Sequence, residues 1–91
     1  MRLDFNETNI LVQAISDLDK QKNSVITKDS LLDFLSVLHD NTSENYSFIR
    51  QSIKTLISKL ENLSDKNIRQ IQNDKRNNKI IASTCYVLPQ L

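Results

Sequence analysis

The stretch Ile68–Leu88, IRQIQNDKRNNKIIASTCYVL, decides which fold this chain is expected to adopt. It contains two segments rich in β-prone residues, at about 67–72 and 79–88, separated by a polar turn. In the second segment apolar residues occupy both alternating sets of positions, as in a strand that is covered on both faces. The turn at 73–78 holds three asparagines, which tolerate a positive φ better than most non-glycine residues. The stretch therefore predicts a β-hairpin with a basic tip.

The chain before this stretch has the apolar periodicity of helices. Apolar residues recur at the spacing of an amphipathic helix in three segments, at about 7–20, 28–39 and 46–62. The pattern is strongest in the third segment, and the polar run 40–45 before it reads as a loop. The sequence thus predicts three helices followed by the hairpin.

Short polar side chains that can cap a helix lie at or before the start of each of these segments. Asn6 or Thr8 is expected to cap the first helix, and Thr27 the second. Asn41 and Glu44 have the spacing of a capping box, which would start the third helix earlier.

Size and composition indicate one folded domain that spans residues 1–91. Apolar residues make up 38% of the chain and charged residues 25%, which is ordinary for a soluble globular domain. The sequence has neither an apolar run long enough to span a membrane nor a signal peptide, so a cytoplasmic location is expected. The single cysteine, Cys85, agrees with a reducing compartment and is expected to be a small core residue.

The charges of the chain are divided unevenly between its two halves. Residues 1–45 hold four basic and eight acidic residues, a net charge of −4, and residues 46–91 hold eight basic and three acidic residues, a net charge of +5. The two halves add up to the overall charge of +1. A polyanion would therefore be attracted to the second half.

The order of helices and hairpin resembles a winged helix-turn-helix domain over residues 5–88. The stretch SFIRQSIKTLISKLENLSDKNIRQIQ, residues 47–72, is similar to that family's recognition helix, helix end and first wing strand. The resemblance implies an α+β, mostly helical fold of three helices followed by a C-terminal β-hairpin. It also implies that the helix at 46–62 enters the DNA major groove and that the hairpin tip at 73–79 contacts the DNA backbone.

The polar face of the 46–62 segment supplies the first group of candidate DNA-binding residues. Arg50 and Gln51 are the candidates for base contacts, because arginine can form two hydrogen bonds to guanine and glutamine two to adenine. The candidates for phosphate contacts are Ser47, Lys54 and Lys59. The alternative is that these cations only keep an amphipathic helix soluble.

The hairpin supplies the second group of candidates. Lys75, Arg76 and Lys79, together with Arg69, form a basic cluster that could neutralise several phosphates. The alternative is that the cluster is only a solvated hairpin tip.

Catalysis, metal binding and cofactor binding find little support in the sequence. His39 is the only histidine and has no second histidine or cysteine at metal-ligand spacing, so it is expected to serve at a helix end instead. The acid pairs Asp17/Asp19 and Asp29/Asp33 have no histidine and no glycine-rich phosphate loop beside them. Neither an enzyme nor a cofactor is expected.

Two functions from different classes remain. The first is a sequence-specific double-stranded DNA-binding protein, either a transcription regulator or a plasmid or phage replication or partition factor. It would act as a homodimer through the first helix or the apolar segment near Tyr86, with its acidic half facing away from DNA or toward a protein partner. The second is a small protein-binding module, an inhibitor or adaptor, whose basic face contacts an acidic protein surface.

Overall fold

Helices make up nearly all the regular structure of this protein, which we describe from a computed structural model for residues 1–22 and 25–89. Within these residues one short 3-10 helix, η1, precedes the third of four α-helices. The elements are α1 (Phe5–Lys22), α2 (Lys28–Asn41), η1 (Glu44–Tyr46), α3 (Ser47–Glu61) and α4 (Asp65–Arg76).

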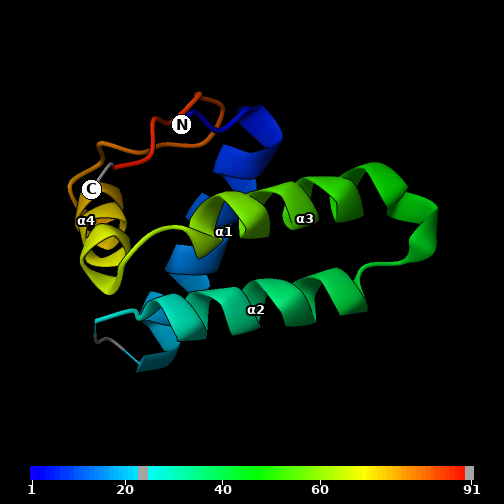
Figure 1. Cartoon of the computed structure of the whole chain (residues 1–91), viewed down its shortest axis with the longest axis horizontal. Coiled ribbons are helices and arrows are strands. Elements are labelled where there is room, and N and C mark those ends of the chain that lie inside the picture. Colours follow the sequence, from blue (N-terminus) through cyan, green and yellow to red (C-terminus); the bar gives the residue numbers. More distant parts are fainter. Residues whose placement is uncertain (23–24, 90–91) are drawn as a thin grey trace.

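The helices form a small bundle in which α2 and α3 lie side by side and run in opposite directions (Figure 1). Helix α1 crosses this pair, and α4 lies at the end of the bundle where α3 finishes and α2 begins. The first turns of α3 are at the other end of the molecule, whose dimensions are 34 × 26 × 22 Å. None of the helices among the described residues is both long and apolar enough to cross a membrane.

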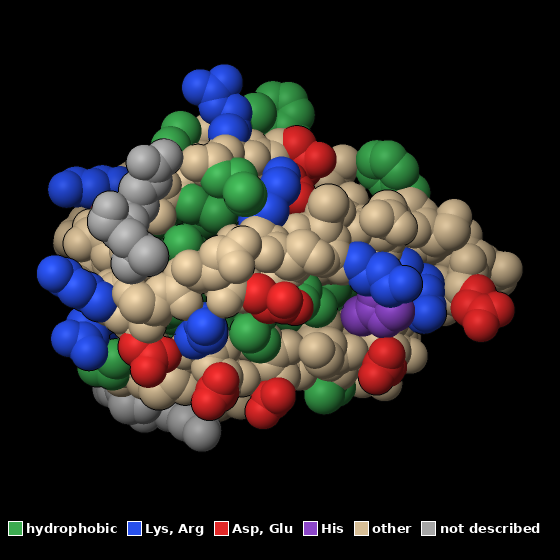
Figure 2. All heavy atoms as spheres, in the orientation of Figure 1, with side chains coloured by type: hydrophobic (Ala, Val, Ile, Leu, Met, Phe, Trp, Pro, Cys, Tyr) green, Lys and Arg blue, Asp and Glu red, His purple; other side chains and the backbone are tan. Residues whose placement is uncertain are grey.

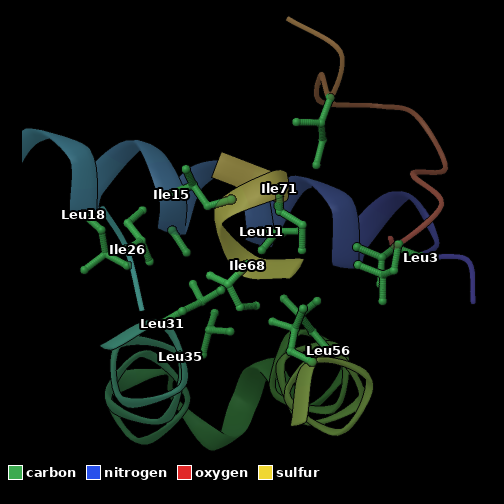
Figure 3. Close-up of a cluster of buried hydrophobic side chains, with 14 of the residues drawn as sticks. Leu3, Leu11, Ile15, Leu18, Ile26, Leu31, Leu35, Leu56, Ile68 and Ile71 are labelled. Carbon is green, nitrogen blue, oxygen red and sulfur yellow. The ribbon is translucent and has the colours of Figure 1, made fainter. Parts of the chain in front are cut away.

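All four α-helices contribute side chains to one hydrophobic core, in which α4 takes part through Ile68 and Ile71 (Figure 3). Both isoleucines are almost completely buried, and each such side chain contributes about 1.5–3 kcal/mol through burial. The other core side chains that Figure 3 labels are Leu3, Leu11, Ile15, Leu18, Ile26, Leu31, Leu35 and Leu56.

The three helices predicted from periodicity are confirmed, but two of the predicted caps are wrong. Helix α1 begins earlier than expected and is capped by Asp4, whose Oδ1 accepts a hydrogen bond from the Glu7 backbone N–H at 2.7 Å. The Glu7 carboxylate in turn accepts from the Asp4 N–H at 2.9 Å, which completes a capping box. Thr27 caps α2 as predicted. Before α3, Ser43 caps η1 and replaces the expected capping box of residues 41 and 44.

The predicted β-hairpin is wrong, because its first strand and most of its turn belong to helix α4. Ser64 begins this helix by accepting a hydrogen bond from the Asn67 N–H, and the Asn67 side chain accepts one from the Ser64 N–H at 3.0 Å. The three-residue spacing of Ile68 and Ile71 places both on one helical face, against the core. Capping and core contacts therefore outweigh the β-propensity of the isoleucines.

The second predicted strand, 79–88, is also absent: residues 77–89 form an irregular segment with positive φ at Asn78 and Ser83. It is attached to the N-terminal residues by a single β-bridge between Arg2 and Val87. The described residues thus hold no β-hairpin and no wing, and the α+β winged helix-turn-helix fold is replaced by an all-helical one. Cys85, expected in the core, is exposed.

Candidate nucleic-acid interface

The exposed side of α4 carries a stripe of cationic and amide side chains. These residues recur at intervals of three, one, three, three and one, so that they lie on one face of the helix, opposite Ile68 and Ile71. All are exposed, and none is acidic. We call this set the α4 stripe; its members are Lys66, Arg69, Gln70, Asn73, Arg76 and Asn77.

The α4 stripe belongs to a basic edge of the molecule. Figure 2 shows Lys and Arg side chains gathered along the edge that α4 forms, and Asp and Glu side chains along the side of α2. Helix α2 exposes three aspartates, Asp29, Asp33 and Asp40. The charge division of the sequence is therefore also a division in space, with α4 on the positive side.

Within the described residues, two cations of the stripe have no internal partner. Neither Lys66 nor Arg69 forms a hydrogen bond or an ion pair through its side chain there. Gln70 donates to Asp74 Oδ1 at 2.9 Å, and Arg76 lies 3.0 Å from Asp19 Oδ1 in an ion pair whose side chains are 46% and 23% exposed. Because solvent screens a partly exposed pair, Arg76 can exchange this partner for an external anion.

Polar contacts, one of them fully buried, fix α4 on the rest of the bundle. Gln72 is almost fully buried; its Oε1 accepts from the Ile26 N–H at 2.8 Å and its Nε2 donates to Asp19 Oδ1 at 2.7 Å. At the first turn, Asp65 Oδ1 accepts from the Lys28 N–H at 2.8 Å. Helix α4 is thus held to the end of α1 and the start of α2, which presents its stripe on a rigid support.

The segment after α4 is attached to it through Tyr86, whose hydroxyl donates to Asp74 Oδ2 at 2.6 Å. Burial, the hydrogen bond to Asp74 and the charge of that carboxylate raise the pKa of Tyr86 well above its usual value of 10.0. The folded state therefore favours the protonated phenol. The resulting stability is complete below pH 10 and is lost as the pH rises above that value.

Tyr86→Phe is accordingly expected to reduce the alkaline loss of stability. Above pH 10 the wild type should lose up to about 1.4 kcal/mol per pH unit through Tyr86, and the variant should lack this component. Urea denaturation between pH 8 and pH 11.5 measures the difference. Tyr46→Phe is the matched control, because Tyr46 is exposed and its replacement should leave the pH profile unchanged. An unchanged profile for Tyr86→Phe would show that the phenol is not held as described.

Two of the cations predicted as DNA contacts are engaged in internal contacts of α3. The guanidinium of Arg50 donates to the backbone oxygens of His39 and Thr42, at 3.1 and 2.7 Å, and so satisfies carbonyls at the end of α2. Lys59 Nζ lies 2.7 Å from Glu7 Oε1 and 3.1 Å from the backbone oxygen of Arg2. Both cations therefore have a structural role inside the protein.

The remaining predicted residues fall into two separate groups. Ser47, Gln51 and Lys54 are exposed on the first half of α3, far along the molecule from α4 (Figure 1). Arg69, Lys75, Arg76 and Lys79 lie on α4 or just after it, where 73–79 was expected to be a hairpin tip. The structure therefore brings the second group together but does not join it to the first.

Sequence reasoning missed Lys66, Gln70, Asn73 and Asn77, because it assigned them to a strand, a turn and the residues beside them. The signal that could have found them is the capping pattern that starts at Ser64, followed by the buried isoleucines of α4. A helix in that register places these four side chains on the face of Arg69.

Neither a metal site among the described residues nor a similarity to known proteins gives a further indication of function. Within the described part of the chain, no group of three or more His, Cys, Asp or Glu residues is placed to hold a metal ion. The backbone oxygen of His39, in the last turn of α2, accepts a hydrogen bond from Arg50, and its Nδ1 lies 3.2 Å from Asp40 Oδ1. Comparison with protein-family models, with curated proteins and with solved structures finds no match to this chain.

Proposed function

We propose that this protein binds double-stranded DNA in a sequence-specific manner and that α4, rather than α3 and a wing, is the element that enters the major groove. The observation that carries the proposal is the α4 stripe, an exposed helical face of cations and amides; the exposed acidic residue of α4, Asp65, lies in its first turn and accepts a hydrogen bond from the Lys28 N–H. A face that served only solubility would be expected to mix both signs of charge, as helix surfaces commonly do.

The side chains at the centre of the stripe are of the types that read bases. Arginine can form two hydrogen bonds to guanine, and asparagine or glutamine can form two to adenine, with about 1–3 kcal/mol of discrimination for each good pair. Arg69, Gln70 and Asn73 are adjacent on the helix surface and take these roles. An α-helix with its side chains is about 10–12 Å in diameter, which suits a major groove about 12 Å wide, and the 12 residues of α4 span about 18 Å.

Cations at the margins of the stripe take the phosphate contacts, which position the protein without reading the sequence. Lys66 lies at the start of α4, Arg76 at its end and Lys79 just after it. The aspartates of α2 would repel the DNA backbone, so the charge division also orients the protein. In this proposal the protein is cytoplasmic and acts in transcription regulation, or in plasmid or phage replication or partition.

Replacing Lys66 and Arg69 by alanine is expected to weaken binding to duplex DNA of any sequence and to reduce its salt dependence. The lost phosphate contact of Lys66 lowers the slope of log affinity against log salt concentration by about 1, and the lost base contact of Arg69 relaxes the base preference at one position. If Arg69 contacts a phosphate instead, the slope should fall by about 2 and the base preference should stay unchanged. Fluorescence anisotropy with a random-sequence duplex at several salt concentrations measures the slope, and a site-selection assay measures the preference.

The control variant, Gln51→Ala/Lys54→Ala, changes two exposed residues of α3 that the sequence had suggested as DNA contacts. It should bind DNA like the wild type. A loss confined to this variant would assign recognition to α3 and reject α4. If the wild type fails to bind DNA even at low salt, the DNA proposal fails, and the basic face then fits the alternative, an acidic surface of a protein partner.

A further inference from the structure

An unusual share of the aromatic side chains faces solvent. The chain has three phenylalanines and two tyrosines, and three of these five residues, Phe5, Tyr46 and Phe48, are more than half exposed. Phe5 begins α1, Tyr46 ends η1 and Phe48 lies in the first turn of α3. Ile49, the residue after Phe48, is also exposed. Aromatic residues are enriched in interfaces because each can bury about 150–250 Å². We call these four residues the aromatic face.

Two residues of the aromatic face, Phe48 and Ile49, line a pocket between α1 and α3. The pocket has a volume of about 200 Å³, and none of its lining residues is charged. A cavity of about 150 Å³ is enough to hold a benzene ring. The lining residues are Asn6, Asn9, Ile10, Phe48, Ile49 and Ser52.

We propose that the aromatic face and its pocket form the contact of a homodimer, in which the Phe48 ring of each copy packs into the pocket of the other. Phe48 is 69% exposed and at the same time lines the pocket, so one small surface offers both a projecting ring and a space for one. In a twofold contact the same patch meets itself, and residue i of one copy meets residue j of the other in both directions. A surface with a ring beside a ring-sized pocket satisfies this condition.

The absence of charge in the lining favours a second copy over an acidic or basic partner. In a twofold contact every charge near the axis faces an equal charge of the other copy, which is unfavourable when desolvated. The pocket is lined instead by apolar side chains, two amides and a hydroxyl, and these amides can donate to and accept from their own copies.

The available area is consistent with a dimer contact. A standard interface buries about 800 Å² per chain, which is about one seventh of the 5659 Å² surface of this chain. With about 150–250 Å² for each aromatic side chain, the exposed parts of the aromatic face supply on the order of half of that area. The polar residues that surround them supply a rim, as in known interfaces.

This dimer would leave the α4 stripe free. The first turns of α3 and helix α4 lie at opposite ends of the molecule (Figure 1), and their residues do not overlap. The dimer proposal therefore does not rest on DNA binding and can be tested without DNA. Should both hold, each dimer carries two α4 stripes for two half-sites.

Phe48→Asp is expected to weaken the dimer at least about a hundredfold, because each copy would then place a carboxylate against an uncharged pocket. Sedimentation equilibrium from micromolar to millimolar chain concentration should show the wild type approaching twice the 10.5 kDa mass of the chain. Phe48 is exposed, so the variant should keep its helical circular dichroism and its midpoint of thermal unfolding within a few degrees.

Val37→Asp is the matched control, since Val37 is an exposed apolar residue of α2 outside the aromatic face. It should dimerise like the wild type. A wild type that stays monomeric throughout the concentration range would overturn the proposal, and so would a dimer that Phe48→Asp leaves intact, because it would then use another face.

Cross-linking gives an independent test of the geometry. A photoreactive phenylalanine at position 48, in an equal mixture of ¹⁴N- and ¹⁵N-labelled chains, should form mixed-isotope cross-links to residues 6–10 of the other copy. Cross-links between copies that map only to other segments would reject this arrangement even if a dimer forms.

Discussion

Lys59→Met should lower the free energy of unfolding by about 3 kcal/mol, because it leaves the Glu7 carboxylate buried without its cationic partner. The Glu7 side chain is 2% exposed, and Lys59 Nζ lies 2.7 Å from its Oε1. Removing one partner of a buried ion pair costs about 3–5 kcal/mol. We expect the lower end of this range, because the Lys59 side chain is itself 25% exposed. Urea denaturation at pH 7 measures the change.

Two further variants separate the ion pair from the effect of the substitution itself. Lys54→Met changes an exposed lysine of the same helix that has no internal partner among the described residues, and it should cost less than about 0.5 kcal/mol. The double variant Glu7→Gln/Lys59→Met removes both charges and should recover much of the loss. A Lys59→Met protein as stable as the wild type would mean that Glu7 is not buried beside Lys59.

This ion pair explains why Lys59 could not be assigned from its position in the sequence. Periodicity places Lys59 on the polar side of its helix, and that assignment is compatible with DNA binding, with solvent or with an internal partner. Its partner is Glu7, 52 residues earlier, and the two meet only because α1 packs on α3. The same holds for Arg50, whose acceptors are carbonyl groups at the end of α2.

The sequence predicted the three helices with the longest apolar periodicity, and these are the three that the structure contains in the first two thirds of the chain. It failed in the last third, where the segment that forms α4 has few apolar residues. In α4 only Ile68 and Ile71 mark the buried face, which is too little for a clear period, and isoleucine is common in strands. Once residues 65–76 are helical, residues 79–88 lose the strand predicted to pair with them and keep only the bridge of Val87 to Arg2, which is too short for a strand.

The sequence predicted several of the basic residues of the candidate site, but it did not predict which side chains share one face. Arg69, Lys75, Arg76 and Lys79 were recognised as one basic cluster, and they do share one region of the molecule. The amides that accompany them, Gln70 and Asn73, became part of the surface only through the helical register of α4. The charge of a segment can be read from the sequence, whereas the side chains that share a face depend on its secondary structure.

Ile71→Ala should lower the free energy of unfolding by about 4 kcal/mol, the largest effect predicted for this protein. Ile71 is fully buried, and truncating a buried isoleucine to alanine costs about 2–5 kcal/mol through lost burial and the cavity left behind. A domain of this size has a total stability of only about 5–14 kcal/mol. Thermal and urea denaturation followed by circular dichroism measure the loss, and backbone ¹³Cα shifts of residues 65–76 report directly whether the segment is helical.

Ile81→Ala provides the matched control, because Ile81 is 53% exposed, and the substitution should change stability by less than about 0.5 kcal/mol. In a hairpin whose second strand is covered on both faces, Ile81 would be costly to truncate as well, so equal losses at the two positions would favour the hairpin over α4.

Comparing Ile71→Ala with Lys66→Ala/Arg69→Ala separates the effect of folding from the effect of DNA contacts. Ile71→Ala removes core packing that supports α4, so it should weaken DNA binding only in proportion to the fraction of unfolded protein. Lys66→Ala/Arg69→Ala removes two positive charges of α4, so it should weaken DNA binding while the free energy of unfolding stays unchanged.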